Sequence, residues 1–113
     1  MQLLDEISDD PKQQFSVITS GGQTFELYLE YRETQELWFG NIVWNELVIN
    51  GLCFVNSPNA LRQWKNLIPF GLAIVTNDAG DPYYLDDFAK GRAFAYVLSE
   101  DEVKSVEEEI YGV

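Results

Sequence analysis

The stretch ELWFGNIVW, residues 36–44, constrains the fold of this chain more than any other segment. Because a β-strand points alternate side chains to opposite faces, Trp38 and Trp44 share one face of such a strand, and Leu37 and Phe39 lie on the other. A half-solvated strand alternates apolar with polar residues, and this one does not. The pattern therefore predicts a strand that is covered on both faces, by the rest of the chain or by a partner.

Five further segments have the composition and alternation of strands, and most are joined by tight turns. Turn residues at Gly21–Gly22, 33–36 and Asn45–Glu46 separate successive strands, which favours antiparallel pairing. Gly51 inside its segment indicates a bulge or a sharp bend. The five segments are 13–20, 25–32, 47–55, 70–77 and 92–98.

Helical patterns occur twice. After the fourth strand, Ser57 can cap a helix that has Pro58 at its first position, and Leu61 and Trp64 begin an apolar repeat that Pro69 stops. Near the C-terminus, the segment 99–102 reads Ser-Glu-Asp-Glu, which is a capping-box pattern. The apolar stripe of this second helix would consist of Val103, Val106 and Ile110.

The chain is therefore predicted to be mainly β, as a small antiparallel β-barrel or a two-layer sandwich of about six strands. One short helix would follow strand 4, and a C-terminal helix would close the chain. Residues 1–12 are expected to form a flexible acidic N-terminal arm, 13–98 the β domain, and 99–113 the C-terminal helix and tail. A length of 113 residues suits one domain.

Charge and composition narrow the range of partners. The chain is 46% hydrophobic, as folded chains are, and has a formal charge of −12. That charge opposes binding to nucleic acid and to anionic membranes. The single cysteine, Cys53, is expected to be a small buried hydrophobe. The acidic start lacks the basic region of a signal peptide, which predicts that the chain stays in the cytoplasm where it is made, unless it is built into an assembly.

Catalytic and metal-binding signals are weak, and we predict no enzyme activity, no cofactor and no metal. The chain has no histidine, which removes the commonest general base and metal ligand. Asp81, Asp86 and Asp87 could serve a glycosidase, and together with Asp78 they could hold calcium, but aspartates also populate turns. Whether this acidic loop, 78–87, binds an ion stays open at this point.

Aromatic residues make up 14% of the chain, more than a small core easily absorbs. A large ring left on an outward face is a candidate anchor for a partner, because tryptophan and tyrosine dominate the energetics of protein interfaces. Most of these rings are nevertheless expected to be core. The interaction candidates are Tyr28, Trp38, Phe39, Trp44, Trp64, Tyr83, Tyr84 and Ile110.

The order of these segments resembles one protein family. The hairpin QQFSVITSGGQTFELYLEYR is followed by the aromatic strand LWFGNIVW and by NELVINGLCFVNSPNALRQW, and then by FGLAIVTND, KGRAFAYV and LSEDEV. This arrangement, over roughly 13–103, resembles the small baseplate plug proteins of contractile-tailed phages, which were first structurally defined in a cyanophage. The acidic loop is a little longer here, and both the acidic start and the KSVEEEIYGV tail lie outside the pattern.

The resemblance implies a non-catalytic structural protein of the phage virion. Its place would be the centre of the tail baseplate, with the hub, the tail tube and the spike and wedge proteins as partners, and it would be present in several symmetric copies. Two alternatives stay open. An acidic regulatory or DNA-mimic protein would bind a basic partner in a strongly salt-sensitive way. A carbohydrate-active enzyme or lectin would lose function on mutation of Asp86 and Asp87.

Overall fold

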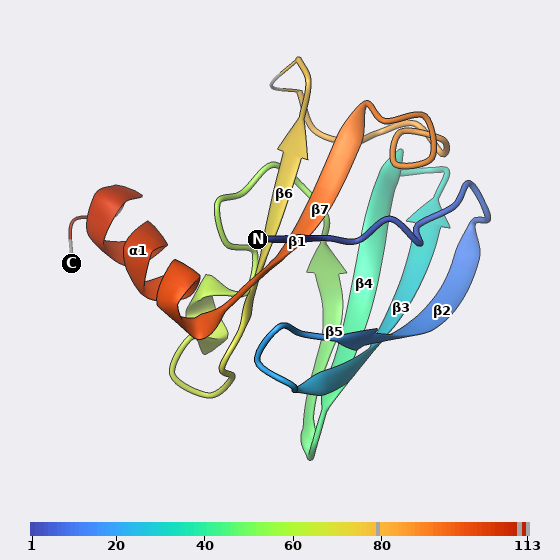
Figure 1. The fold of residues 1–113 in the computed structure, drawn as a ribbon. Coiled ribbons are helices and arrows are strands. Elements are labelled where there is room, and N and C mark those ends of the chain that lie inside the picture. Colours follow the sequence, from blue (N-terminus) through green and yellow to red (C-terminus); the bar gives the residue numbers. More distant parts are fainter. Residues whose placement is uncertain (79, 111, 113) are drawn as a thin grey trace.

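The computed structural model describes residues 1–78, 80–110 and 112, and within them the chain is mainly β. Seven strands form two antiparallel sheets in this described part, and one α-helix follows them (Figure 1). The predicted class, the antiparallel pairing and the C-terminal helix are confirmed. The elements are β1 (Gln2–Leu3), β2 (Lys12–Ile18), β3 (Thr24–Arg32), β4 (Leu37–Trp44), β5 (Leu47–Cys53), the 3-10 turn η1 (Arg62–Trp64), β6 (Gly71–Thr76), β7 (Ala93–Leu98) and α1 (Glu100–Ile110).

The larger sheet is a four-stranded meander in the order β2-β3-β4-β5. Its turns are formed by the residues that the sequence indicates: Gly22 adopts a φ of 86° and Asn45 a φ of 53°, the left-handed region that tight turns need. The register of β4 with β5 shifts between Gly40 and Ile42, opposite the segment that contains Gly51. The predicted bulge at Gly51 is therefore confirmed.

The smaller sheet has the order β1-β7-β6, and its outer strand β1 comes from the predicted N-terminal arm. Gln2 pairs with Val97 and Leu3 with Tyr96, so the first residues of the chain add a short strand to β7. Leu4 and Ile7 are both buried and join the main core. These contacts place the start of the chain against the β domain.

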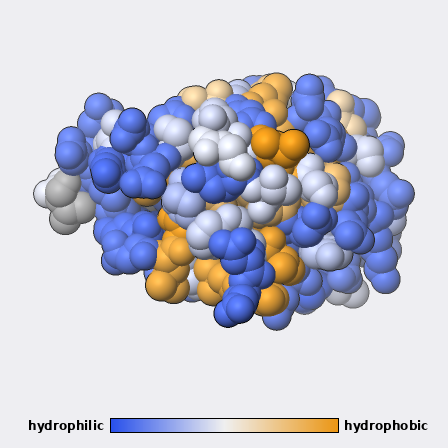
Figure 2. Space-filling view, turned by 60° about the horizontal axis from the view of Figure 1, so that its bottom comes forward, coloured by the Kyte–Doolittle hydropathy of each residue, from blue (hydrophilic) through white to orange (hydrophobic). Residues whose placement is uncertain are grey.

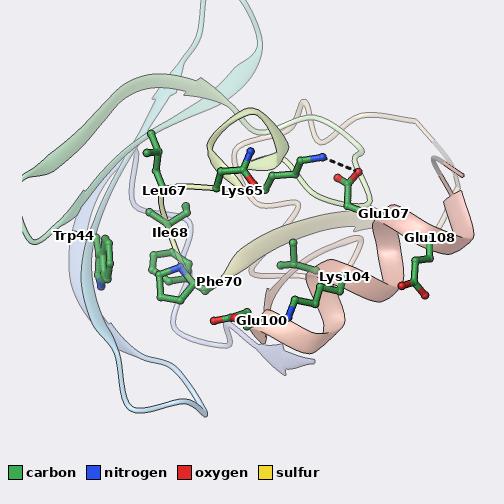
Figure 3. A pocket seen from close by; sticks show the side chains of 12 residues that line it. Trp44, Lys65, Leu67, Ile68, Phe70, Glu100, Lys104, Glu107 and Glu108 are labelled. Atoms are coloured by element: carbon green, nitrogen blue, oxygen red, sulfur yellow. Dashed lines mark hydrogen bonds and ion pairs between the residues drawn. The ribbon is translucent and has the colours of Figure 1, made fainter. Parts of the chain in front are cut away.

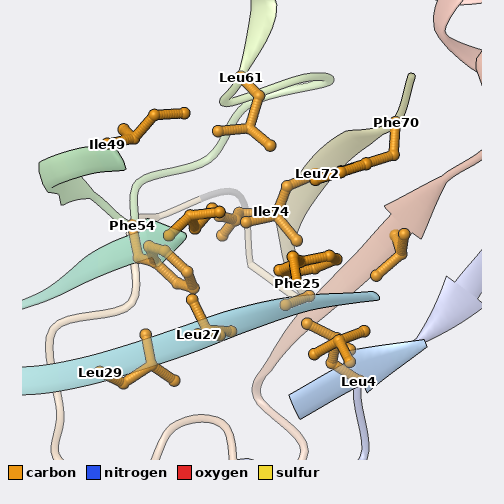
Figure 4. Packing of buried hydrophobic residues seen from close by; sticks show 14 of the residues in the cluster. Leu4, Phe25, Leu27, Leu29, Ile49, Phe54, Leu61, Phe70, Leu72 and Ile74 are labelled. Atoms are coloured by element: carbon orange, nitrogen blue, oxygen red, sulfur yellow. The ribbon is translucent and has the colours of Figure 1, made fainter. Parts of the chain in front are cut away.

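One hydrophobic core lies between the two sheets (Figure 4). Leu27 and Ile42 enter it from the larger sheet, and Leu72 and Ile74 from the smaller one. The rings of Phe25 and Phe70 stack across it, with centroids 4.5 Å apart and planes 11° apart. Because each sheet turns an apolar face toward the other, two layers suffice to enclose the core.

The closed barrel, one of the two predicted architectures, is wrong. Strands β1 and β6 are the edge strands of one sheet, and β2 and β5 are the edge strands of the other. The short helix predicted after the fourth strand of the β domain, which is β5 in the structure, is also wrong. Ser57 is extended and exchanges two backbone hydrogen bonds of 3.0 Å with Ile74 of β6. The Ala60 N–H donates to the carbonyl of Leu72 at 2.6 Å, and only η1 is helical. Pairing with the edge of β6 therefore outweighs the local helical signal.

Helix α1 begins as predicted. The Ser99 hydroxyl accepts from the Glu102 N–H at 3.2 Å, and the Glu102 carboxylate accepts from the Ser99 N–H at 3.1 Å. Glu102 also pairs with the amino group of Met1 at 2.5 Å. Val103 packs beside Leu98 at the end of β7. Figure 1 shows that α1 projects to one side of the two sheets. Among the described residues, no helix is long and apolar enough to cross a membrane.

Candidate partner-binding surface

The inner face of β4 is covered by the chain itself from Trp38 to Ile42, whereas Trp44 at the end of the strand is only half-buried. Trp38 is 0% exposed and contacts Tyr31 and Phe88 edge-on, at centroid distances of 5.5 Å and 6.1 Å. Gly40 lies between Trp38 and Ile42 and makes room for the ring of Phe54. The chain itself therefore shields the ring of Trp38 from solvent.

The outer face of β4 is covered only in part. Phe39 is half-buried, and the guanidinium of Arg32 lies 4.3 Å from its ring centroid. Tyr28 of β3 stands beside it, partly exposed, opposite Asn41 in the register. These residues line a shallow hollow of about 390 Å³ on the outer face of the larger sheet. This face mixes aromatic rings with polar side chains, and both kinds of residue occur in protein interfaces.

A larger hollow lies where α1 approaches the loop before β6 (Figure 3). This groove has a volume of about 630 Å³ and is lined by residues 65–70, by one side of α1, and by Trp44 at the end of β4. Ile68, Phe70 and Val103 are buried beneath it, whereas Leu67 is 62% exposed at its rim. The groove is therefore apolar at its base and open to solvent.

An ion cluster ties the two walls of the groove together. The carboxylate of Glu107 accepts from Arg62 Nε at 2.9 Å, from Arg62 Nη2 at 3.2 Å and from Lys65 Nζ at 3.1 Å. Burial raises the pKa of Glu107, but the hydrogen bonds from Arg62 and Lys65 outweigh it, and the pKa lies below its ordinary value. Glu107 is thus ionised at neutral pH, and its ion pairs with Arg62 and Lys65 hold α1 against η1.

The exposed surface on this side combines apolar and acidic regions. Figure 2 shows an apolar area beside a mainly hydrophilic projection. α1 carries six acidic residues against one lysine, a formal charge of −5. Acidic residues near the C-terminal end of a helix oppose the macrodipole. Glu108 and Glu109 stand there, exposed, and neither makes an ion pair within the described part of the chain.

The acidic loop is organised around Arg92. Its Nη1 donates to the buried carboxylate of Asp87 at 2.6 Å, and its Nη2 donates to Asp78 at 3.0 Å. Asp87 also accepts the N–H groups of Tyr83 and Tyr84, each at 2.9 Å. The guanidinium carbon of Arg92 lies 4.4 Å from the ring centroid of Tyr83. Asp87 thus holds the backbone turn of this loop.

The other two aspartates of the loop also have partners. Asp86 pairs with Lys90 at 2.7 Å, and Asp81 accepts the N–H of Asn56 at 2.9 Å. The hydrogen bond from Lys90 lowers the pKa of Asp86, and the N–H of Gly80 together with Arg92 lowers that of Asp78. Among the residues that the structure describes, no group of three or more acidic or thiol side chains converges as a metal site would require. The geometry of the loop is that of a braced turn.

The interaction candidates do not form one surface and are spread over six places. Tyr28 and Phe39 lie together on the outer sheet face, Trp44 lines the groove, and Tyr83 and Tyr84 contact each other with ring centroids 4.5 Å apart. The remaining three are separate: Trp38 is core, Trp64 is half-buried in η1 against the core, and Ile110 is 58% exposed at the end of α1.

Sequence reasoning missed two features of the groove, the exposed Leu67 and the ion cluster of Glu107. The exposure of Leu67 follows from the 3-10 turn that forms where the sequence predicts a longer helix. The cluster of Glu107 with Arg62 and Lys65 joins residues more than 40 positions apart. The only available signal was Glu107 itself, an acid on the border of the apolar stripe of α1.

The fold and these surfaces together define a small two-sheet β protein that leaves an apolar groove and part of one sheet face uncovered. The family model described as "Cyanophage baseplate Pam3 plug gp18" matches residues 1–100. The chain therefore belongs to this family of cyanophage baseplate plugs, as its segment order suggested, and is a structural protein of the phage tail baseplate. A comparison with curated proteins found no match.

Proposed function

We propose that this protein is a non-catalytic plug at the junction of the baseplate hub and the tail tube, held there by protein–protein packing. The family match over residues 1–100 carries the proposal. The apolar groove and the half-covered outer face of the larger sheet support it, because both offer apolar area to neighbours. The tube, hub, spike and wedge proteins are the proposed partners, in several symmetric copies.

The acidic loop supports a role without catalysis. A general acid needs a carboxyl group with a raised pKa. The carboxylates of Asp78 and Asp86 instead have lowered pKa values, because each accepts hydrogen bonds from cations or backbone amides. Asp87 is buried beneath Arg92 and the turn that it holds. These carboxylates brace the loop through contacts with Lys90 and Arg92.

The formal charge of −12 suits a protein beside a DNA conduit, since it repels the phosphate backbone and leaves the path clear. The same charge would serve a DNA mimic, so salt dependence separates the two roles. Raising salt from about 0.1 M to about 1 M shortens the Debye length from about 10 Å to about 3 Å and weakens charge-driven binding. Packing of apolar surfaces survives that change.

The test is co-expression of the chain with the hub and tube proteins of the same phage, followed by size-exclusion chromatography at both salt concentrations. A plug co-elutes with hub or tube at high salt as well as at low salt. Failure to co-elute at either concentration would contradict the proposal. Co-elution that is lost at high salt would instead favour the acidic-mimic role.

A further inference from the structure

We propose that the groove between α1 and residues 65–70 binds a segment of a neighbouring baseplate protein that carries apolar side chains followed by a lysine or arginine. The inference rests on the proposed function for the identity of the neighbour, and on the chemistry of the groove for the character of the segment. Three properties of the groove support it: its size, the composition of its base, and the charge at one end.

The size and composition of the groove fit a short apolar segment. A cavity of about 150 Å³ accommodates one benzene ring, so the volume of about 630 Å³ has room for roughly four side chains of that size. Phe70 and Val103 form an apolar base, and Leu67 stands 62% exposed at the rim. Covering Leu67 removes apolar area from water, which favours binding.

The charges of the groove select the polar part of the segment. Glu107 is already neutralised by Arg62 and Lys65, and Glu100 lies 3.8 Å from Lys104. Glu108 lines the groove, and Glu109 follows it. Both stand in the last turn of α1, where the helix dipole already concentrates negative potential. A cation of the partner would neutralise this end, whereas an acidic partner would be repelled.

The first test uses two synthetic amphipathic peptides with leucines at identical helical spacing, one flanked by lysines and the other by glutamates. Nuclear magnetic resonance titration of the labelled protein follows each peptide. We expect the lysine peptide to shift the amide signals of residues 65–70 and of α1, and the glutamate peptide to bind at least about tenfold more weakly. Equal binding of the two peptides, no binding, or shifts confined to the outer sheet face would overturn the inference.

A charge-reversed variant provides the control. Glu108→Lys with Glu109→Lys should weaken the lysine peptide at least about tenfold and leave α1 folded, because lysines near the end of a helix suit its dipole. The matched variant, Glu6→Lys with Glu33→Lys, makes the same change in net charge at exposed positions away from the groove. Equal weakening by both variants would show general attraction to an acidic protein and would overturn the inference.

The second test uses assembled tails. Leu67 is replaced by a photo-crosslinking amino acid in the phage, and Val75, exposed on β6 and outside the groove, is the control position. We expect a crosslink at 67 to an apolar segment that contains lysine or arginine. No crosslink, an acidic segment or a second copy of this chain would overturn the inference and leave the baseplate role intact. Absence of the chain from purified tails would contradict the proposed function. In that case the peptide titration alone tests whether the groove binds apolar segments with a basic residue.

Discussion

Replacing Gly40 with alanine tests how the aromatic strand is covered on its inner face. A Cβ atom added at Gly40 would lie 2.7 Å from Cε1 and 3.3 Å from Cζ of Phe54, and 3.4 Å from Cδ2 of Leu29. Phe54 is 0% exposed and in turn contacts Phe88, so it has no free space to move into. Overpacking of this kind costs about 1–3 kcal/mol.

The assay is urea denaturation followed by tryptophan fluorescence, because Trp38 is buried two residues away on the same face. Gly40→Ala should lower the free energy of unfolding by about 1–3 kcal/mol. Gln14→Ala, an exposed position on β2, serves as the control and should change it by less than about 0.5 kcal/mol. A loss at Gly40 as small as the control would refute the close packing of Phe54.

A double variant tests whether residues 40 and 54 compete for the same space in the core. Phe54→Leu alone should cost about 1–3 kcal/mol, because it removes ring atoms from a fully buried position. Combined with Gly40→Ala, it frees the space that the new methyl group needs. The double variant should therefore lose less than the sum of the single losses, by at least about 0.5 kcal/mol. Additive losses would mean that the two residues do not compete for one space.

Three further changes have expected outcomes. Asn59→Ala removes the buried oxygen that accepts from the N–H groups of Leu61 and Leu72 at 3.0 Å and 3.1 Å, and should cost about 2–4 kcal/mol in urea denaturation. Asp87→Ala removes the buried carboxylate that accepts from Arg92 and from the N–H groups of Tyr83 and Tyr84, and should cost about 2–4 kcal/mol in thermal unfolding. The exposed Asp9→Ala should cost almost nothing. The lowered pKa of Glu107 means that its stabilising effect is complete above the ordinary pKa of about 4.3 and is lost as pH falls through the lower folded-state value. When the pH falls below that ordinary value, the Glu107→Gln variant should therefore lose less unfolding free energy than the unchanged protein does. The same pH dependence in both proteins would contradict the ion cluster.

The strands and turns were predictable because their signals are local. Alternation of side chains marks β3, and Gly21–Gly22 and Asn45–Glu46 supply the backbone conformations that tight turns need. The capping box at Ser99 was predictable for the same reason, since both of its partners lie within one helical turn. The family resemblance was visible in the order of these local signals.

The remaining features depend on residues that are distant in sequence. The helical pattern after Ser57 is overridden by pairing with Ile74, which local propensity cannot register. Closure of a barrel depends on which strands are left at the edges, and here β1 and β6 end the smaller sheet. The groove exists only because residues 65–70 meet α1, so no pattern in either segment alone predicts it. Strand alternation separated Trp38 from Phe39, but it could not say which of them faces the core.

The central claim is that this chain is a packed component of the baseplate, held by surfaces that it leaves uncovered as a protomer. Cryo-electron microscopy of intact tails from the phage that encodes it tests this most directly. The account predicts density for the two-sheet fold at the hub and tail-tube junction, with neighbouring protein against the groove beside Leu67. A map in which that junction is occupied entirely by other chains, with this protein missing from the purified particles, would contradict it.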